Sequence, residues 1–419
     1  MDDSISNAST GTPPAASSAR QILPPSPPSG NKRKWQAGRW LVRCVLALCF
    51  LVGFYLSVFP SGRALTRAVM IVPGLISAES PGWEKPVDEP IKHIQETISS
   101  GAGPVYLDIY EPTDSQPPVP GAREGMLMIP GVGDQRKQPQ VVNFSETLAA
   151  SGVVVMGMTT PALIANRLEA SDEEAVVQAF QKLQHWSGVN PTHVGMFGIS
   201  GGGGLMCLAA ADARIRDQVR FVALLGSYFD ATTLLQTIGQ RAQTENGQTQ
   251  PWSPNPYPLQ VLANTVAPLM PEQDARLLTK AFQTKSSGSL SQEQIRQLAP
   301  SSAAFYHLLA GDETNRVNAN LAALPPEMKE LLASVSPSRV VDQIQAPVYL
   351  LHDRSDQFVP VTQSSDFAAT LANLHHSYDF AEFGIFQHAV VVSNPSLSEE
   401  LGDGLKLVRF VNETMQVGS

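Results

Sequence analysis

The sequence predicts an α/β protein with a mostly parallel central sheet flanked by helices, an inserted block of helices, and one N-terminal transmembrane helix. Short apolar segments alternate with amphipathic ones from about residue 90 onward, which is typical of parallel strands joined by covering helices. This alternation stops over residues 227–343 and then resumes. An apolar stretch of about 20 residues near the N-terminus is long enough to span a bilayer.

These changes of pattern divide the 419 residues into six segments. They are a disordered Pro/Ser-rich tail (1–37), a transmembrane helix (38–60), a membrane-proximal linker (61–89), the first part of the α/β core (90–226), a helical lid insertion (227–343) and the second part of the core (344–419). An ordinary crossover between parallel strands would be much shorter than the fifth segment, so we interpret that segment as a lid.

The tail cannot bury a core, because it consists mainly of Ser, Pro, Ala, Gly and Asn. More basic residues precede the apolar stretch than follow it, which predicts a single-pass protein with a cytoplasmic N-terminus and an extracytoplasmic main domain. The alternative for this stretch is a buried core helix. A second apolar patch, residues 68–76, contains Pro73-Gly74 and is expected on the membrane surface or packed on the domain.

Charge and cysteine content exclude several classes of protein. The formal net charge is -9 and the globular part has no long basic stretch, so nucleic acid is not expected as a partner. The three cysteines form no C-x-x-C pair, so neither a disulfide framework nor a zinc site is indicated. The run Gly201–Gly204 is followed by Leu205 and not by the lysine that a phosphate-binding loop requires. We therefore predict no metal and no cofactor.

A glycine-flanked serine follows the apolar run Val194–Ile199, in the pattern Gly198-Ile199-Ser200-Gly201-Gly202. The run predicts a short buried strand, and the apolar residues after the glycines predict a buried helix. A G-x-S-x-G turn between a strand and a helix strains the serine backbone and exposes the hydroxyl at the edge of a sheet. Ser200 is therefore the candidate nucleophile. The alternative is a glycine-rich connection with an incidental serine.

A serine nucleophile needs a base to take its proton and a carboxylate to orient that base. A predicted strand ends at Leu351, and the loop after it places Asp356 beyond the strand's carboxyl end. Asp356 is the first candidate for the carboxylate. Asp353 in the same loop and Asp230 after the preceding strand are the alternatives.

His388 follows the last predicted strand, Tyr378–Phe383, by a short glycine-containing loop. In isolation it would be interpreted as a surface histidine. The chain order Ser200, Asp356, His388, with each residue after its own strand, predicts all three at one edge of a parallel sheet. This order favours His388 as the general base. The other histidines fit less well, including His352, which shares the loop of the acid.

Backbone N–H groups are the expected donors to an oxyanion. Gly201 directly follows the candidate nucleophile at a predicted helix N-terminus and supplies one donor. The glycines of Pro130–Gly133 follow another apolar strand and free the backbone there, and Val132 is the predicted second donor.

From about residue 90 to the C-terminus, the chain resembles the α/β-hydrolase fold superfamily. Val105–Pro112 and Asn190–Gly202 are similar to the early strand and the nucleophile region of dienelactone-hydrolase-like and prolyl-oligopeptidase-like members. The resemblance implies an α/β-hydrolase fold with a nucleophile at Ser200, an acid at Asp356 and a base at His388. It also implies the hydrolysis of an ester, thioester or amide.

Together these features predict a membrane-anchored serine hydrolase that cleaves a carboxylic ester or thioester through an acyl-enzyme intermediate. The expected partners are a small-molecule or lipid acyl substrate and a membrane. The apolar helices of the predicted lid favour an esterase or lipase. The alternatives are an acyltransferase with the same triad, a peptidase, and a non-catalytic binding protein on a hydrolase fold. The sequence indicates neither the acyl chain nor the oligomeric state.

Overall fold

The computed structural model describes residues 62, 65–66, 68–69, 72, 91–113, 121, 123–245, 247–283, 289–384, 386–388, 390–391 and 397–416. The chain divides into two compact units, Met1–Ser57 and Val58–Ser419, and every described residue belongs to the second. The predicted tail 1–37, the predicted span 38–60 and most of the predicted linker lie outside the described residues. Within the described ranges, no helix is both long and apolar enough to cross a bilayer.

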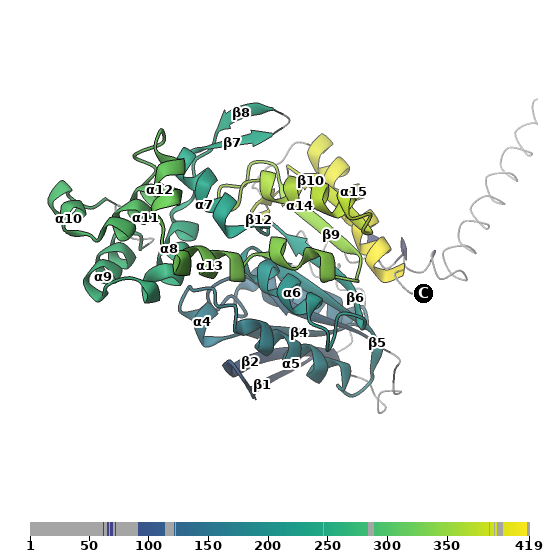
Figure 1. Cartoon of the computed structure of the whole chain (residues 1–419). Coiled ribbons are helices and arrows are strands. Elements are labelled where there is room, and N and C mark those ends of the chain that lie inside the picture. The colour runs from purple at the N-terminus through teal and green to yellow at the C-terminus, as the bar shows by residue number, and fades with distance from the viewer. Residues whose placement is uncertain are drawn as a thin grey trace, which may run out of the picture. The chain divides into compact units, whose positions relative to one another are not determined.

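An eight-stranded, mostly parallel sheet forms the centre of this unit (Figure 1). The strand order is β1-β2-β4-β3-β5-β6-β9-β10. Neighbours from β4 to β10 pair in parallel, while β2 runs antiparallel to both β1 and β4. The strands are β1 (Ile91–Ser100), β2 (Gly103–Pro112), β3 (Arg123–Ile129), β4 (Val154–Thr159), β5 (Val189–Ile199), β6 (Val219–Leu225), β9 (Val348–Asp353) and β10 (Tyr378–Phe383).

The burial of each strand follows its place in the sheet. Every residue of β4 and of β9 is buried, as expected for strands covered on both faces. The edge strand β1 instead alternates between more and less exposed positions, in agreement with the pattern of its sequence. Because β3, β5, β6 and β9 are parallel, their carboxyl ends meet at one edge of the sheet. The loops with the candidate site residues start at this edge.

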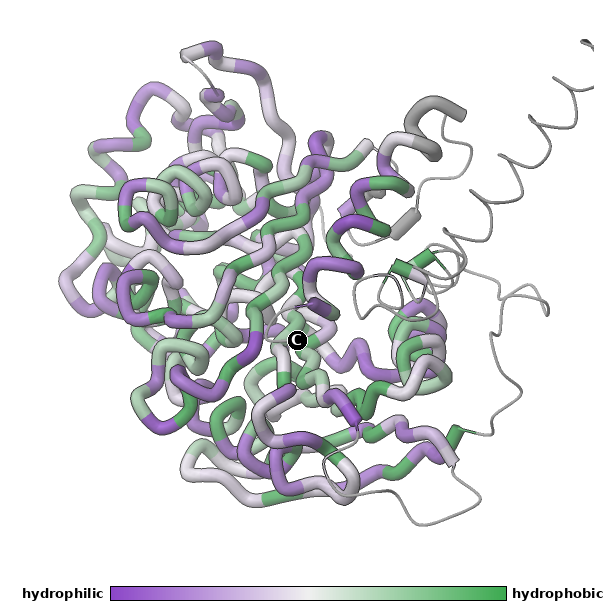
Figure 2. The backbone as a smooth tube through the Cα atoms, turned by 90° about the vertical axis from the view of Figure 1, so that its right-hand side faces the viewer, coloured by the Kyte–Doolittle hydropathy of each residue, from purple (hydrophilic) through white to green (hydrophobic). Residues whose placement is uncertain are grey.

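Helices cover both faces of the sheet, and apolar residues concentrate along the central strands (Figure 2). One face is covered by α5 (Asp172–Gln184), α6 (Gly201–Ala211) and α14 (Thr362–Asn373), and the other by α3 (Pro139–Ala150) and α15 (Leu397–Gln416), while α4 (Pro161–Ile164) follows β4. Ala68 and Val72 are helical and buried in the apolar cluster of the α3 and α15 face. At these two positions, the patch 68–76 therefore packs on the domain.

Between β6 and β9 the chain leaves the sheet and builds a block of helices, which we call the insertion (residues 227–343; Figure 1). It contains α7 (Ala231–Gln240), β7 (Ala242–Glu245), β8 (Gln248–Pro251), α8 (Pro256–Val266), η1 (Ala267–Leu269), α9 (Glu272–Ala281), α10 (Gln292–Gln297), α11 (Pro300–Ala310), α12 (Val317–Ala323), α13 (Pro326–Ser334), η2 (Pro337–Arg339) and η3 (Val341–Gln343). The β7–β8 hairpin has an almost entirely polar sequence, so no apolar periodicity predicts it. A second small hairpin, β11 (Phe386–Gln387) and β12 (Val390–Val391), follows β10.

At the N-terminus of α5, the sequence Ser171-Asp172-Glu173-Glu174 predicts a capping box, and this prediction is wrong. The Ser171 side chain makes no capping hydrogen bond. The Ser171 backbone is already helical, with φ -60° and ψ -21°, whereas an N-cap residue is usually extended. Asp172 turns inward, is 2% exposed and accepts a hydrogen bond from Thr160 Oγ1 at 2.8 Å. Burial raises the pKa of Asp172 to about 6. A contact with the core thus replaces the local cap.

Candidate active site

Ser200 lies at the sharp turn between β5 and α6. Its backbone has φ 54° and ψ -128°, a conformation that is unfavourable for a residue with a side chain. Its N–H donates to the Leu225 carbonyl at 2.9 Å, which ties the turn to the end of β6. The serine is half-buried. The turn therefore has the strained backbone that its sequence pattern predicts, at the carboxyl edge of the sheet.

Close packing explains the glycines around Ser200. A Cβ atom on Gly198 would lie 2.4 Å from the backbone of α6. A Cβ atom on Gly201 would lie 2.5 Å from the side chain of Val132. Glycine is needed at both positions because real Cβ atoms do not approach other atoms so closely. The same packing brings the two predicted oxyanion donors, Gly201 and Val132, next to each other.

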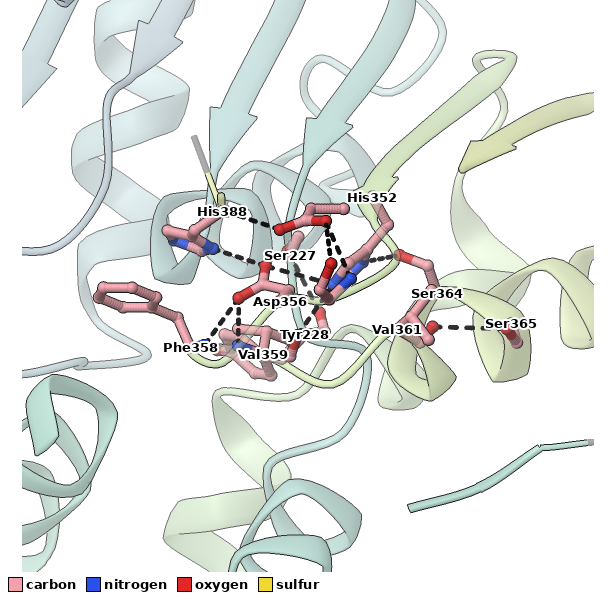
Figure 3. Close-up of polar contacts among 12 residues, drawn as sticks. Ser227, Tyr228, His352, Asp356, Phe358, Val359, Val361, Ser364, Ser365 and His388 are labelled. Atoms are coloured by element: carbon pink, nitrogen blue, oxygen red, sulfur yellow. Dashed lines mark hydrogen bonds and ion pairs between the residues drawn. The ribbon is translucent and has the colours of Figure 1, made fainter. Parts of the chain in front are cut away.

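Asp356 is 1% exposed, and its two carboxylate oxygens have different hydrogen-bond partners (Figure 3). Oδ1 accepts the backbone N–H groups of Phe358 at 2.6 Å and Val359 at 3.1 Å. Oδ2 accepts from His388 Nδ1 at 2.7 Å, and His352 Nε2 lies 3.4 Å from it. Burial alone would raise the pKa of Asp356, but the two histidines overcome this effect and hold the pKa well below its ordinary range.

His388 lies against the Ser200 turn through two shared neighbours. A Cβ atom on Gly226 would lie 3.0 Å from His388 Nδ1, and Gly226 directly follows Leu225, whose carbonyl binds the serine backbone. The ring of Phe358 stacks on the imidazole with a centroid distance of 4.4 Å and also borders the cavity at Ser200. The structure therefore brings the three predicted triad residues to one corner of the sheet edge.

The two alternative acids have other partners. Asp353 Oδ2 accepts the backbone N–H of His388 at 3.0 Å, so it holds the main chain of the histidine and not its ring. Asp230 caps α7 by accepting two backbone N–H groups with Oδ1, and its Oδ2 accepts from Ser338 Oγ at 2.6 Å. Of the three carboxylates, Asp356 alone contacts the imidazole of His388.

His352 has a structural role that its position in the sequence did not indicate. It is 0% exposed, with Nε2 3.0 Å from the Val359 carbonyl and Nδ1 2.7 Å from Ser364 Oγ. Because a carbonyl can only accept, Nε2 carries the proton and Nδ1 accepts from the serine hydroxyl. His352 thus braces the loop of Asp356 from its buried side, and no local motif could have revealed this contact.

The loop after β3 presents the second predicted oxyanion donor. The Val132 carbonyl accepts from Tyr257 Oη at 2.7 Å and from Gln135 Nε2 at 3.0 Å. Across the described part of the chain, the N–H groups of Val132 and Gly201 donate to no protein acceptor. Both are therefore available to stabilise an oxyanion. Tyr257 belongs to α8 of the insertion, and its distance of 125 positions from Val132 hides the contact from sequence reasoning.

An apolar cavity of about 40 Å³ borders Ser200. Val132 and Phe358 line one part of it, and Leu234 of α7 and Val261 of α8 line another. A larger cavity of about 420 Å³ lies on the α3 and α15 face of the sheet and is lined by none of the predicted site residues. Of the predicted site residues, Ser200, Gly201 and Val132 line the small cavity.

The strand order, the strained serine after β5 and the chain order Ser200, Asp356, His388 are those of the α/β-hydrolase fold. This is the fold that the sequence resemblance implied. The order of the predicted triad residues along the chain also differs from the orders in chymotrypsin and in subtilisin.

No family model and no curated protein matches the chain. Similar solved structures include dipeptidyl peptidase 4 of Porphyromonas gingivalis (12% identity, TM-score 0.46, 78% of this chain and 35% of that chain) and a puromycin-hydrolyzing peptidase of Mycobacterium tuberculosis (16%, 0.47, 78% and 39%). Esterase B of Lactobacillus Rhamnosis is a third (16%, 0.43, 79% and 88%). The chain thus spans less than half the length of the two peptidases, and no substrate follows from similarities of this size.

Proposed function

We propose that this protein is a serine hydrolase that cleaves a carboxylic ester or thioester through an acyl-enzyme intermediate. The observation that carries the proposal is the 2.7 Å contact between His388 Nδ1 and Asp356 Oδ2, beside a strained serine that opens on an apolar cavity. A carboxylate that orients an imidazole next to a serine is the arrangement that activates a hydroxyl as a nucleophile.

The proposed reaction assigns one role to each group. Asp356 accepts from Nδ1 of His388, which leaves Nε2 as the base that takes the proton of Ser200. The serine oxygen attacks the acyl carbonyl, and the N–H groups of Gly201 and Val132 stabilise the oxyanion. His388 then protonates the leaving alcohol or thiol. Water repeats the sequence and releases the acid.

The cavity supports a short acyl group as the substrate. A cavity needs a volume of about 10–15 Å³ to hold one water molecule. The cavity of about 40 Å³ at Ser200 therefore holds only a few heavy atoms. The wall is formed mainly by apolar side chains from α7, α8 and the loop after β3 (residues 130–135), which we call the oxyanion loop. Such a wall suits an aliphatic chain and offers no partner for a charge. Esters of about two to four acyl carbons should therefore react best.

A fluorophosphonate probe and p-nitrophenyl esters of increasing acyl length test this proposal. We expect labelling of the wild-type protein, loss of labelling in Ser200→Ala, and the highest kcat/KM for the short esters. Ser334→Ala is the control, because Ser334 is a half-buried serine of the insertion whose hydroxyl, among the described residues, bonds only within its own helix. Labelling that survives in Ser200→Ala would refute the nucleophile. A wild-type protein that reacts with no probe or ester would be a binding protein on a hydrolase fold.

We also propose that residues 38–60 anchor the protein in a membrane, with the hydrolase domain on the extracytoplasmic side. The support is the uncharged run from residue 44 to 59 and the excess of basic residues before it. Membrane fractionation of the full chain and of a chain that starts at residue 61 tests the anchor. Both chains in the soluble fraction would contradict it. Protease protection of the domain in sealed vesicles tests its side.

A further inference from the structure

The chain from the end of β8 into the first turn of α8 bonds two loops of the candidate active site. We call residues 252–257 the strap. Trp252 at one end is 6% exposed, and its indole Nε1 donates to the backbone carbonyl of Asp356 at 2.7 Å. Next to it, the N–H of Asn255 donates to the Gln357 carbonyl at 2.7 Å. This end of the strap is therefore attached to the loop of the proposed acid.

The other end of the strap is attached to the oxyanion loop. Tyr257 Oη is 2.7 Å from the Val132 carbonyl and 2.7 Å from Asn166 Oδ1. A phenol has one hydrogen and donates to one of these two oxygens at a time, and the Val132 carbonyl also accepts from Gln135 Nε2. Burial raises the pKa of Tyr257 to about 12, which means that the phenol keeps the proton it donates at neutral pH.

We propose that the strap positions the acid loop and the oxyanion loop relative to each other, with Trp252 and Tyr257 as positioning residues. The proposal rests on the serine hydrolase function proposed above. The carbonyl of Val132 shares its peptide plane with the N–H of Gly133, which donates to the Leu163 carbonyl at 2.8 Å. Fixing both sides of this plane restricts the ψ angle of Val132 and so supports the position of the residue whose own N–H is the proposed oxyanion donor. Fixing the carbonyl of Asp356 restricts the loop that orients His388. The insertion then belongs to the framework of the active site, in addition to covering it.

The variant Tyr257→Phe removes one oxygen atom and keeps the ring beside Phe358. We expect kcat for a short ester to fall about three- to tenfold, which is the range for the loss of one positioning hydrogen bond. KM should stay within about twofold, since the apolar wall of the cavity is unchanged. Trp252→Phe should likewise lower kcat. If the strap acts as one unit, the double variant should lose less than the product of the two single losses.

Tyr306→Phe is the matched control. Tyr306 is a buried tyrosine of the same insertion, 2% exposed, whose hydroxyl accepts from the Leu290 N–H at 3.0 Å, away from both loops. It should keep wild-type kcat within about twofold. Equal losses in Tyr257→Phe and Tyr306→Phe would overturn the proposal, because they would indicate a general loosening of the insertion. A wild-type kcat in Tyr257→Phe would also overturn the proposal.

Hydrogen–deuterium exchange separates this proposal from the proposed function. In Tyr257→Phe, amides of the loop at residues 130–135 should exchange faster, and in Trp252→Phe those of residues 356–359 should do so, whether or not the protein is active. If the probe does not label the wild-type protein, the proposed hydrolase function is refuted. The exchange result would still decide whether the strap positions the two loops. Unchanged exchange in both variants would refute the strap even if Ser200 is labelled.

Discussion

The loop after β6 and the loop after β9 start side by side, because the two strands pair in parallel. Each loop carries an aspartate that caps a turn in the same way. Asp230 Oδ1 accepts the N–H groups two and three residues ahead, and Asp356 Oδ1 does the same. The difference lies in the second oxygen, which faces Ser338 in the first loop and His388 in the second.

This comparison shows that the local structure around a carboxylate does not define its role. Both aspartates use one oxygen to stabilise the chain ahead of them, as Asp commonly does in turns and at helix N-termini. The role is decided by the distant residue that meets the free oxygen. For Asp230 that residue is a hydroxyl of η2, and for Asp356 it is the imidazole of the proposed base.

The largest expected effect is that of Asp356→Asn. The amide would present N–H groups where the carboxylate accepts from His388 Nδ1, so the imidazole would take the wrong tautomer and lose its stabilising charge. We expect kcat for a short ester to fall by about 10⁴. Retention of a tenth or more of wild-type activity would contradict Asp356 as the acid and reopen the choice of carboxylate.

The pH dependence of stability tests the same carboxylate without reference to activity. The pKa of Asp356 is lower in the folded protein than the value of about 3.9 for a free aspartate. The unfolded chain therefore binds the proton first as the pH falls, and the stabilising contribution of Asp356 is lost on acidification. The difference in urea unfolding free energy between wild type and Asp356→Asn should shrink from pH 5 to pH 3. A constant difference would contradict the depressed pKa.

A smaller effect is expected for Asp353→Ala, which removes the acceptor of the His388 N–H. His388 has φ 61°, a strained value for a residue with a side chain, and Asp353 holds its N–H at 3.0 Å. Loss of a hydrogen bond to a charged group costs about 1.5–3 kcal/mol, so kcat should fall about ten- to a hundredfold. Single-turnover labelling by the fluorophosphonate measures this step. A loss as large as that of Asp356→Asn would mean that both carboxylates orient the ring.

The smallest effect on activity is expected for Asp230→Ala. The variant removes the N-cap of α7 and the partner of Ser338, which should lower the free energy of unfolding by about 0.5–2 kcal/mol. At temperatures where it is folded, kcat/KM should remain within about twofold of wild type. Thermal unfolding and ester kinetics measure the two parts. A loss of activity without a loss of stability would indicate that this loop supplies the acid.

Much of the fold could be predicted from the sequence. Strands such as β4 and β9 are buried along their whole length, so each appears in the sequence as a short apolar run. The helices α5 and α15 show their amphipathic periods in the same way. The β7–β8 hairpin could not be predicted because its residues are almost all polar. The capping box at Ser171 does not form, and the first turn of α5 instead holds the buried Asp172, which accepts from Thr160.

The candidate site likewise has one part that the sequence could predict and one part that it could not. The glycines around Ser200 report a close approach of helix and strand, which is a property of a few consecutive residues and is therefore visible in the sequence. The order of Ser200, Asp356 and His388 after parallel strands was likewise enough to predict one shared edge. The parts played by His352, Trp252 and Tyr257 were not predictable, because each acts through a backbone or side-chain partner that its own surroundings do not specify.

By itself, then, the sequence determined the fold class, the strained serine and the chain order of the candidate triad, because these depend on short-range periodicity and on glycine packing. Only the tertiary structure decided which carboxylate meets the histidine and that the insertion bonds both active-site loops. The physical reason is that a hydrogen bond is directional and depends on positions to within a fraction of an ångström. Such positions are set by the packing of segments that lie between 32 and 125 positions apart in the chain.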